Sequence, residues 1–137
     1  MDRSCEVVVV SADSESGRNV AETLARLEVG AVCIPTVEQY REIAGTGQLK
    51  LVFCDANLPD GDYRDVVAAT AARSTQKAPN VVIMTGHLNP DSYQQAKRAG
   101  IFEAIPKPCR PTDIEWMVIL AKRQDRRHAL AGLRSAG

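Results

Sequence analysis

The chain has few aromatic residues, no excess of either charge and no long apolar run. Aromatic side chains make up 4% of its 137 residues, and 17 Lys and Arg balance 17 Asp and Glu. A protein that binds nucleic acid directly is normally strongly basic, so we expect no direct nucleic-acid binding. The longest apolar runs, such as 7–10 and 81–84, are far shorter than the roughly twenty residues that cross a bilayer. The N-terminus also lacks the apolar core of a signal peptide, and we expect a cytoplasmic domain without membrane association.

The four cysteines are scattered and form no metal-binding pattern. They contain no C-x-x-C pair, and neither of the two histidines lies near one of them in the sequence. A zinc site or a disulfide framework is therefore not expected, and reduced cysteines fit a cytoplasmic protein. The apolar neighbours of Cys5, Cys33 and Cys54 predict that these three are small core residues.

Charge is distributed unevenly along the chain. Residues 122–137 contain five Lys and Arg against one Asp, so this segment carries +4 and residues 1–121 carry −4. The length suits a single domain, which we assign to 1–121, followed by a basic helical extension or the start of a linker at 122–137. Three roles stay open for this extension: a solvated helix end leading to an output domain not in this chain, a dimerising helix, and a nucleic-acid contact.

Five short apolar segments alternate with five segments of helical periodicity. Strands are predicted at 6–11, 31–34, 49–54, 81–84 and 101–105. Helices are predicted at 15–28, 36–44, 63–73, 90–98 and from 111 onward. Strict alternation indicates parallel strands joined by crossover helices, and apolar runs without polar alternation indicate strands buried on both faces. We therefore predict an α/β fold: a flavodoxin-like, doubly wound sheet of five parallel strands in the order 2-1-3-4-5, with helices on both faces.

Polar side chains follow four of the predicted strands, at the edge where functional groups of such sheets gather. They are Asp13, Asp55, Thr85 and Lys107, the last of which lies between two prolines. Two close carboxylates repel each other unless a cation accompanies them, and Mg²⁺ accepts carboxylates and a carbonyl while keeping waters. A carboxylate can also attack phosphorus, while a lysine and a hydroxyl neutralise phosphoryl oxygens. This set indicates phosphoryl transfer to an aspartate.

Three motifs carry a resemblance to a known family. They are LVFCDANLPDG at 51–61, VVIMTG at 81–86, and Ala99-Gly100 followed seven positions later by Lys107-Pro108. With these motifs in order, residues 5–121 resemble the receiver domain of two-component response regulators. The resemblance implies that Asp55 is the phosphoacceptor and that Thr85 and Lys107 contact the phosphoryl group. It also implies that Asp13, Asp55 and the backbone carbonyl of Asn57 hold Mg²⁺.

The resemblance further implies a signalling module of bacterial phosphorelays rather than an enzyme. The chain would accept a phosphoryl group from a histidine kinase or a histidine phosphotransfer protein. Only self-phosphorylation and self-dephosphorylation are expected of it. Its signal would pass to an output domain or a downstream protein not in this chain, and a homodimer is a further expected partner arrangement.

Two positions depart from the family's pattern. Counting back from Arg18, the acidic pair that follows the first strand is Ala12-Asp13, so one acid is missing; Glu15 could compensate in part. Ala104 stands where an aromatic residue usually responds to the movement of the strand-end threonine. Both departures favour an alternative, a pseudo-receiver that acts as a phosphorylation-independent protein-interaction module. A phosphatase like the haloacid dehalogenases is disfavoured, because Asn57 stands where those enzymes need a second Asp.

Overall fold

The computed structural model describes residues 6–45, 49–73 and 78–136. Its centre is a sheet of five parallel strands in the order β2-β1-β3-β6-β7. The strands are β1 (Val7–Val10), β2 (Ala31–Ile34), β3 (Leu51–Asp55), β6 (Asn80–Thr85) and β7 (Glu103–Pro106). Counted along the chain, this is the predicted order 2-1-3-4-5, and the α/β fold class is confirmed.

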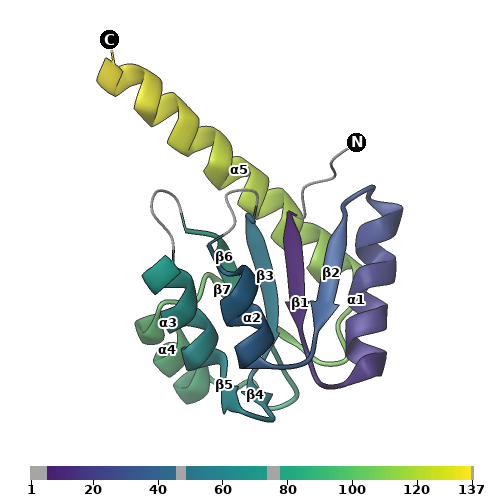
Figure 1. Cartoon of the computed structure of the whole chain (residues 1–137). Helices are drawn as coiled ribbons and strands as arrows, with labels where there is room; N and C mark the ends of the chain where they lie inside the picture. The colour runs from purple at the N-terminus through teal and green to yellow at the C-terminus, as the bar shows by residue number, and fades with distance from the viewer. Residues whose placement is uncertain (1–5, 46–48, 74–77, 137) are drawn as a thin grey trace.

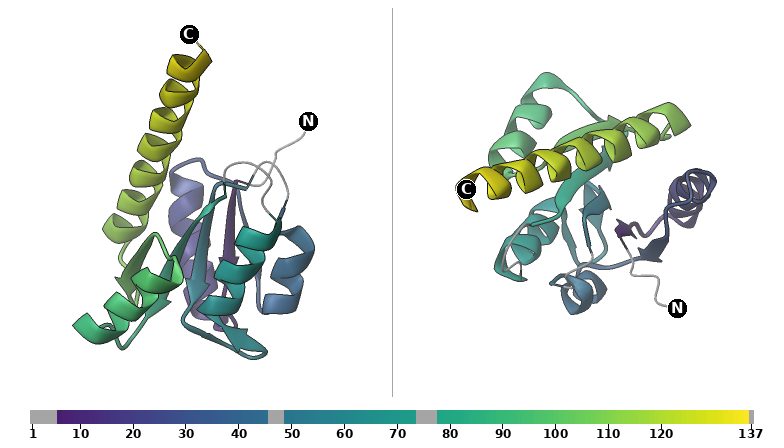
Figure 2. Two further views of the ribbon diagram at one scale, coloured as in Figure 1. Left: turned by 90° about the vertical axis from the view of Figure 1, so that its left-hand side faces the viewer. Right: turned by 90° about the horizontal axis from the view of Figure 1, so that it is seen from above.

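Helices cover both faces of the sheet, as predicted (Figure 1). Helices α1 (Ser14–Arg26) and α5 (Pro111–Ala136) pack on one face. The other face carries α2 (Val37–Ile43), α3 (Tyr63–Arg73) and α4 (Pro90–Ala99). Figure 2 shows the resulting three layers from two further directions, with the sheet between the two groups of helices.

The apolar runs are explained by the alternation of side chains along each strand. In β1, Val7 and Val9 belong to the cluster under α1 and α5, whereas Val8 and Val10 belong to the cluster under α2 and α3. The side chains of β3 alternate in the same way. Because both faces are covered, the inner positions of the central strands are apolar, and no polar alternation remains for a sequence pattern to detect.

The edge strand β2 departs from this rule. It pairs with β1 alone, so no strand covers its outer side, and Val32 keeps 44% of its surface exposed. Cys33 is exposed as well, so the prediction of a core cysteine is wrong at this position. It is confirmed for Cys54, which is fully buried on β3, and Cys5 lies outside the described residues.

The last strand of the sheet begins two residues later than predicted. Gly100 closes α4 in the left-handed region at φ 111°, and its N–H donates to the carbonyl of Ala96. The N–H of Ile101 donates to the same carbonyl, so the backbone of both residues is still hydrogen-bonded to the last turn of α4. Pairing with β6 starts at Phe102, whose N–H donates to Val81, and β7 therefore begins at 103.

Two features lie outside the predicted pattern. A two-stranded antiparallel sheet, β4 (Asn57–Leu58) with β5 (Gly61–Asp62), follows β3, and strands this short leave no periodicity in the sequence. Gly61 lies close to Asp65, because a Cβ at position 61 would be 2.3 Å from Asp65 Oδ2 and would displace that side chain. The second feature is the length of α5, whose backbone continues past the sheet as one helix through the predicted basic extension to Ala136 (Figure 1).

Helices α2 and α3 are joined by a buried polar contact. The phenol oxygen of Tyr40, a fully buried residue, lies 2.5 Å from Thr70 Oγ1, and the Thr70 hydroxyl donates to the carbonyl of Val66 at 2.7 Å. Since the Thr70 proton is used, the Tyr40 phenol is the donor in this pair. Burial raises the pKa of Tyr40 to about 12, which keeps the phenol protonated.

We predict that Tyr40→Phe lowers the free energy of unfolding by about 1 kcal/mol, the net value of a typical buried hydrogen bond. Thr70→Val should cost more, because it leaves a buried phenol without its acceptor. Urea denaturation of both variants and of the double variant measures the coupling between the two side chains. Strictly additive losses would show that this contact carries no net stabilisation.

Candidate functional site

The strand register brings three of the predicted site residues to one edge of the sheet. Asp55 ends β3 and pairs with Met84, one residue before Thr85. Thr85 pairs with Pro106, and its carbonyl accepts the N–H of Lys107 at 2.9 Å. Parallel strands end on the same side, so Asp55, Thr85 and Lys107 meet where β4 and β5 lie in Figure 1.

Asp55 and Lys107 form a close ion pair. Lys107 Nζ lies 2.7 Å from Asp55 Oδ1, and the two side chains are 24% and 7% exposed. Oδ1 is buried and accepts no aligned hydrogen bond from the residues that the structure describes, so charge attraction holds the pair. That attraction is stronger here than at the surface, because little water remains around the carboxylate.

Ser11 is a site residue that sequence reasoning did not identify. Its hydroxyl lies 2.7 Å from Asp55 Oδ2 and donates to it, while the N–H of Asp13 donates to the same hydroxyl at 3.1 Å. Ser11 follows Val10, the last residue of β1, which pairs with Cys54 next to Asp55. The available signal was its place directly after a strand, at the edge where the acidic residues lie.

Asp13 caps the first helix. Its carboxylate accepts the Glu15 N–H at 3.1 Å and the Ser16 hydroxyl at 2.7 Å. The Ser16 hydroxyl is the main reason why the pKa of Asp13 lies below its ordinary value, and the positive charge of Lys107 lowers this pKa further. Asp13 is therefore an ionised group near Lys107, with both carboxylate oxygens engaged at the start of α1.

Thr85 and Ala104 occupy the positions that the motif spacing gave them. Thr85 is half-buried at the end of β6, and its hydroxyl oxygen accepts the N–H of His87 at 3.1 Å. This bond uses a lone pair, so the hydroxyl proton can still be donated. Ala104 is half-buried on the neighbouring strand β7, packed against the small cluster beneath α4, and it presents only a methyl group.

The loop that follows Asp55 is anchored at both ends. Its first residue, Ala56, donates its N–H to Met84 and accepts the N–H of Tyr63, each at 3.1 Å. Further along, the Asp60 carboxylate accepts the N–H groups of Val37 and Glu38 at 2.8 and 3.0 Å. The Val37 contact is the main reason why the pKa of Asp60 is lowered. The loop containing Asn57 is thus tied to the first turn of α2.

The oxygen donors at this edge fit a magnesium ion in type. Asp13 and Asp55 supply carboxylates and Asn57 a backbone carbonyl, and Mg²⁺ typically takes one or two carboxylates and keeps several waters. Both oxygens of Asp55 are engaged, Oδ1 by the Lys107 ammonium and Oδ2 by the Ser11 hydroxyl, so a cation would have to share one of them. Among the described residues, no three His, Cys, Asp or Glu side chains cluster for metal binding, so any ion here relies on water for much of its coordination.

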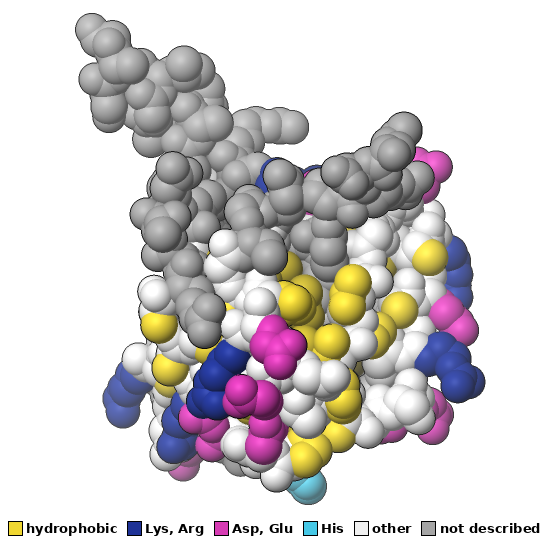
Figure 3. All heavy atoms as spheres, viewed as in Figure 1, with side chains coloured by type: hydrophobic (Ala, Val, Ile, Leu, Met, Phe, Trp, Pro, Cys, Tyr) yellow, Lys and Arg dark blue, Asp and Glu magenta, His cyan; other side chains and the backbone are white. Residues whose placement is uncertain are grey.

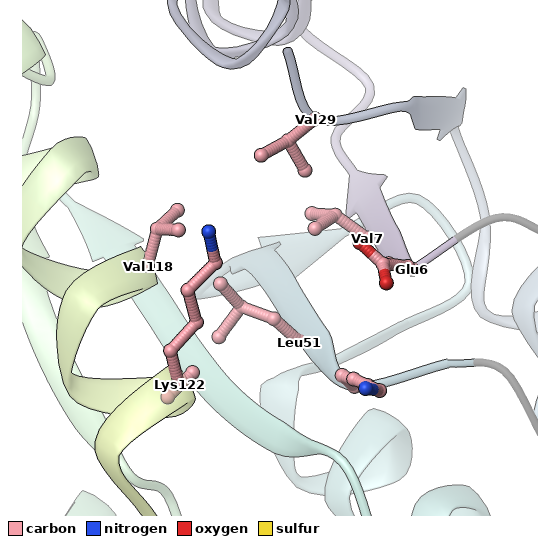
Figure 4. A pocket seen from close by; sticks show the side chains of 8 residues that line it. Glu6, Val7, Val29, Leu51, Val118 and Lys122 are labelled. Atoms are coloured by element: carbon pink, nitrogen blue, oxygen red, sulfur yellow. The ribbon is translucent and has the colours of Figure 1, made fainter. Parts of the chain in front are cut away.

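Two cavities of the described chain lie away from Asp55. One of about 70 Å³ lies between α5 and the starts of β1 and β3, and Val7, Leu51, Val118 and Lys122 are among the residues that line it (Figure 4). Another, of about 310 Å³, is lined by Phe102, Leu120, Arg123 and Gln124. Neither lining includes Asp55, Thr85 or Lys107.

The next two observations concern the distribution of surface charge and the length of the helices. On the face covered by α2 and α3, Lys and Arg side chains are interspersed with Asp and Glu, without a broad area of one sign (Figure 3). Among the described residues, no helix combines the length and the apolar character required to span a lipid bilayer.

The chain is similar to known regulators in sequence. It is 29% identical over 101 residues to the response regulator protein PilR of Pseudomonas aeruginosa. This match covers 74% of the chain but only 22% of PilR, so the chain corresponds to a fraction of that protein's length.

Solved receiver domains share the fold. The receiver domain of a LuxO repressor protein from Vibrio parahaemolyticus matches with a TM-score of 0.81 at 17% identity, over 92% of this chain and 95% of that one. The beryllofluoride-activated NtrC4 receiver domain dimer gives 0.78 at 18% identity, over 87% and 97%. CheY4 of Vibrio cholerae matches with a TM-score of 0.77 at 18% identity, over 85% of this chain and 98% of CheY4. At these identities, the likeness establishes the fold.

The family follows from a match that covers most of the chain. Residues 7–119 match the model of the response regulator receiver domain, close to the predicted extent of 5–121. The match includes all three motifs and the strand edge with Asp55, Thr85 and Lys107. The chain therefore belongs to the response regulator receiver domain family, the signalling modules of two-component systems.

Proposed function

We propose that this chain is a phosphoacceptor receiver that takes a phosphoryl group on Asp55 in the presence of Mg²⁺. The observation that carries the proposal is the nearly buried Asp55 carboxylate, held 2.7 Å from the Lys107 ammonium at the strand edge. The lysine ammonium holds this carboxylate in place, and a carboxylate oxygen can act as a nucleophile toward phosphorus.

The transfer is a displacement at phosphorus. An oxygen of Asp55 forms a bond to the phosphorus of a phosphohistidine, and the bond between phosphorus and the imidazole nitrogen breaks. That nitrogen keeps the electron pair of the broken bond, so a ring protonated on its other nitrogen leaves as neutral histidine. The product is an aspartyl phosphate, and attack of water on its phosphorus later restores the carboxylate and releases phosphate.

Lys107 and Thr85 serve the phosphoryl group through charge and hydrogen bonding. Lys107 already contacts Asp55 and is close enough to neutralise a phosphoryl oxygen added there. Thr85 follows Met84, the register partner of Asp55, and retains a hydroxyl proton that a phosphoryl oxygen can accept. Both groups are fixed by strand ends, so little rearrangement precedes the reaction.

The metal site in this proposal consists of Asp13, Asp55 and the backbone carbonyl of Asn57. A bound Mg²⁺ would neutralise charge on the transferred phosphoryl group. Asp13 supports this role by staying ionised near Lys107, since its pKa lies below the ordinary value. The loop anchored through Ala56 and Asp60 holds the segment that contains Asn57 at the same edge.

The phosphodonor is a histidine kinase or a histidine phosphotransfer protein of the cytoplasm. The receiver family supports this assignment, because two-component receivers take phosphoryl groups from histidine. PilR is much longer than the matched region, which favours an output domain or a separate downstream protein as the recipient of the signal. A homodimer is a further option for the output, and the NtrC4 receiver is described as a dimer.

A second candidate function is that of a pseudo-receiver, which binds a partner without phosphorylation. The contact that favours it is that of the Ser11 hydroxyl, which already engages the second oxygen of Asp55. Asp13 is in addition engaged as the cap of α1. On this interpretation, the polar edge stabilises the fold, and recognition depends on a surface that does not change.

Phosphorylation distinguishes the two candidates. Incubation with Mg²⁺ and acetyl phosphate should add the mass of one phosphoryl group, labile to hydroxylamine. Asp55→Asn should abolish this gain in mass, because the side-chain amide of asparagine does not attack phosphorus. Asp91→Asn, which removes an exposed carboxylate in the first turn of α4, should leave it intact. An unchanged intact mass under saturating donor would favour the pseudo-receiver.

The two roles of Asp13 can be separated by a pair of variants. Asn caps helices about as well as Asp, whereas Ala does not, so Asp13→Asn should keep the melting temperature and Asp13→Ala should lower it. Both variants lack the carboxylate, and both should weaken Mg²⁺ binding by about tenfold or more. Thermal unfolding and Mg²⁺ titration by amide NMR measure the two effects. Full Mg²⁺ affinity in Asp13→Asn would remove Asp13 from the metal site.

The response to activation should be largest in the loops after β3 and β6 and in the first turn of α2. Ala104 has no ring to bury, so drawing in Thr85 changes little apolar area on β7 and α5. The loop after β3 is tied through Asp60 to Val37 and Glu38, which should carry the change into α2. We expect large amide shifts on beryllofluoride addition at 57–61, at 86–89 and at these two residues. Large shifts limited to β7 and α5 would contradict this.

A further inference from the structure

The hydroxyl of Ser11 has two acceptors within reach. It lies 2.7 Å from Asp55 Oδ2 and 3.2 Å from the backbone carbonyl of Asp13. A hydroxyl has one proton, so it donates to one of them at a time, and the shorter contact to a carboxylate is the stronger. The Asp13 N–H donates to the same oxygen at 3.1 Å and keeps Ser11 in place while its proton changes acceptor.

The donated proton compensates part of the charge on Asp55. Oδ1 faces the Lys107 ammonium, and Oδ2 faces the Ser11 hydroxyl, so positive charge reaches the carboxylate from both sides. A cation that approaches Oδ2 meets a hydrogen that carries positive partial charge. It binds favourably only after this hydrogen has turned away, and the Asp13 carbonyl is the acceptor that makes the turn possible without leaving the hydroxyl unpaired.

Ala12, the next residue along the chain, cannot compensate the charge on Asp55. Ala12 is exposed and has no polar atom in its side chain, whereas Ser11 follows directly on the register pair Val10 and Cys54 and reaches Asp55. The side chain that faces the acceptor at the end of β1 is thus the serine, although counting along the sequence put the missing acid at Ala12.

We propose that Ser11 is a positioning residue whose hydroxyl takes the place of a cation at Asp55 Oδ2 in the resting site and turns to the Asp13 carbonyl when Mg²⁺ binds. Ser11 thereby sets the affinity of this edge for a divalent cation. The proposal rests on the proposed function, since it concerns the aspartate assigned as phosphoacceptor. It makes the native site a weak Mg²⁺ site whose resting charge is compensated by the protein.

Titration with Mg²⁺ alone, followed through the amide shifts of residues 11, 55 and 107, tests the proposal. Ser11→Ala removes the competing proton and should tighten Mg²⁺ binding about fivefold, whereas Ser11→Thr keeps the hydroxyl and should match the native protein. Ser11→Asp adds a charge facing Asp55 and should tighten binding further, by more than about tenfold. Ala12→Asp is the matched control, and its exposed, screened charge should change the affinity by less than about threefold.

Thermal unfolding supplies a second readout. Without Mg²⁺, Ser11→Asp should melt below the native protein because two carboxylates face each other, and Mg²⁺ should restore the loss. Weaker or unchanged Mg²⁺ binding in Ser11→Ala would overturn the proposal, as would equal tightening by Ala12→Asp and Ser11→Asp. None of these titrations uses a phosphodonor, so a failure of Asp55 to accept phosphate would contradict the proposed function and leave the order of affinities intact.

Discussion

The 2.7 Å contact between the Lys107 ammonium and Asp55 joins the end of β3 to the segment that follows β7. Most of the edge depends on it, because a carboxylate exposed over only 7% of its side chain would be costly without a partner. The four residues of β3 that precede Asp55 are apolar and buried, and they pack alternately under the helices on the two faces of the sheet. A rigid sheet therefore places one anion and one cation together, and a third group can join them only at this edge.

The other polar groups around this pair stabilise helix starts and loops, and they also lie at the proposed site of phosphorylation. Asp13 caps α1, Asp60 accepts two N–H groups of the first turn of α2, and Ser11 links the backbone at Asp13 to Asp55. Each of these groups stabilises a helix start or a loop while it stands at the edge where phosphoryl chemistry is proposed. A ligand at Asp55 therefore has to exchange existing hydrogen bonds, and these exchanges supply a physical route from the site to the first turns of α1 and α2.

The strand order, the helices on both faces and the meeting of Asp55, Thr85 and Lys107 could be predicted, because hydrophobic periodicity and motif spacing determine which strand ends carry polar groups. Ser11 was missed, because its place directly after a strand shows only that it lies near this edge, and its contact with Asp55 depends on the register between β1 and β3. The sequence is compatible with Asp13 as the cap of α1 and also as a Mg²⁺ ligand. Both roles use the same carboxylate, so the sequence does not separate them. The exposure of Cys33 escaped prediction because an apolar edge strand has the same composition as a buried one.

The central claim, that Asp55 is the nucleophile, is tested most directly by locating the phosphoryl group after transfer from a phosphorylated histidine phosphotransfer protein. Borohydride reduces an aspartyl phosphate to homoserine, and peptide mass spectrometry then identifies the residue that was modified. The account predicts homoserine at position 55 in the reduced protein and aspartate there when the phosphodonor is left out. Homoserine at Asp13 or Asp60, or none at all under complete loss of the donor phosphohistidine, would contradict it.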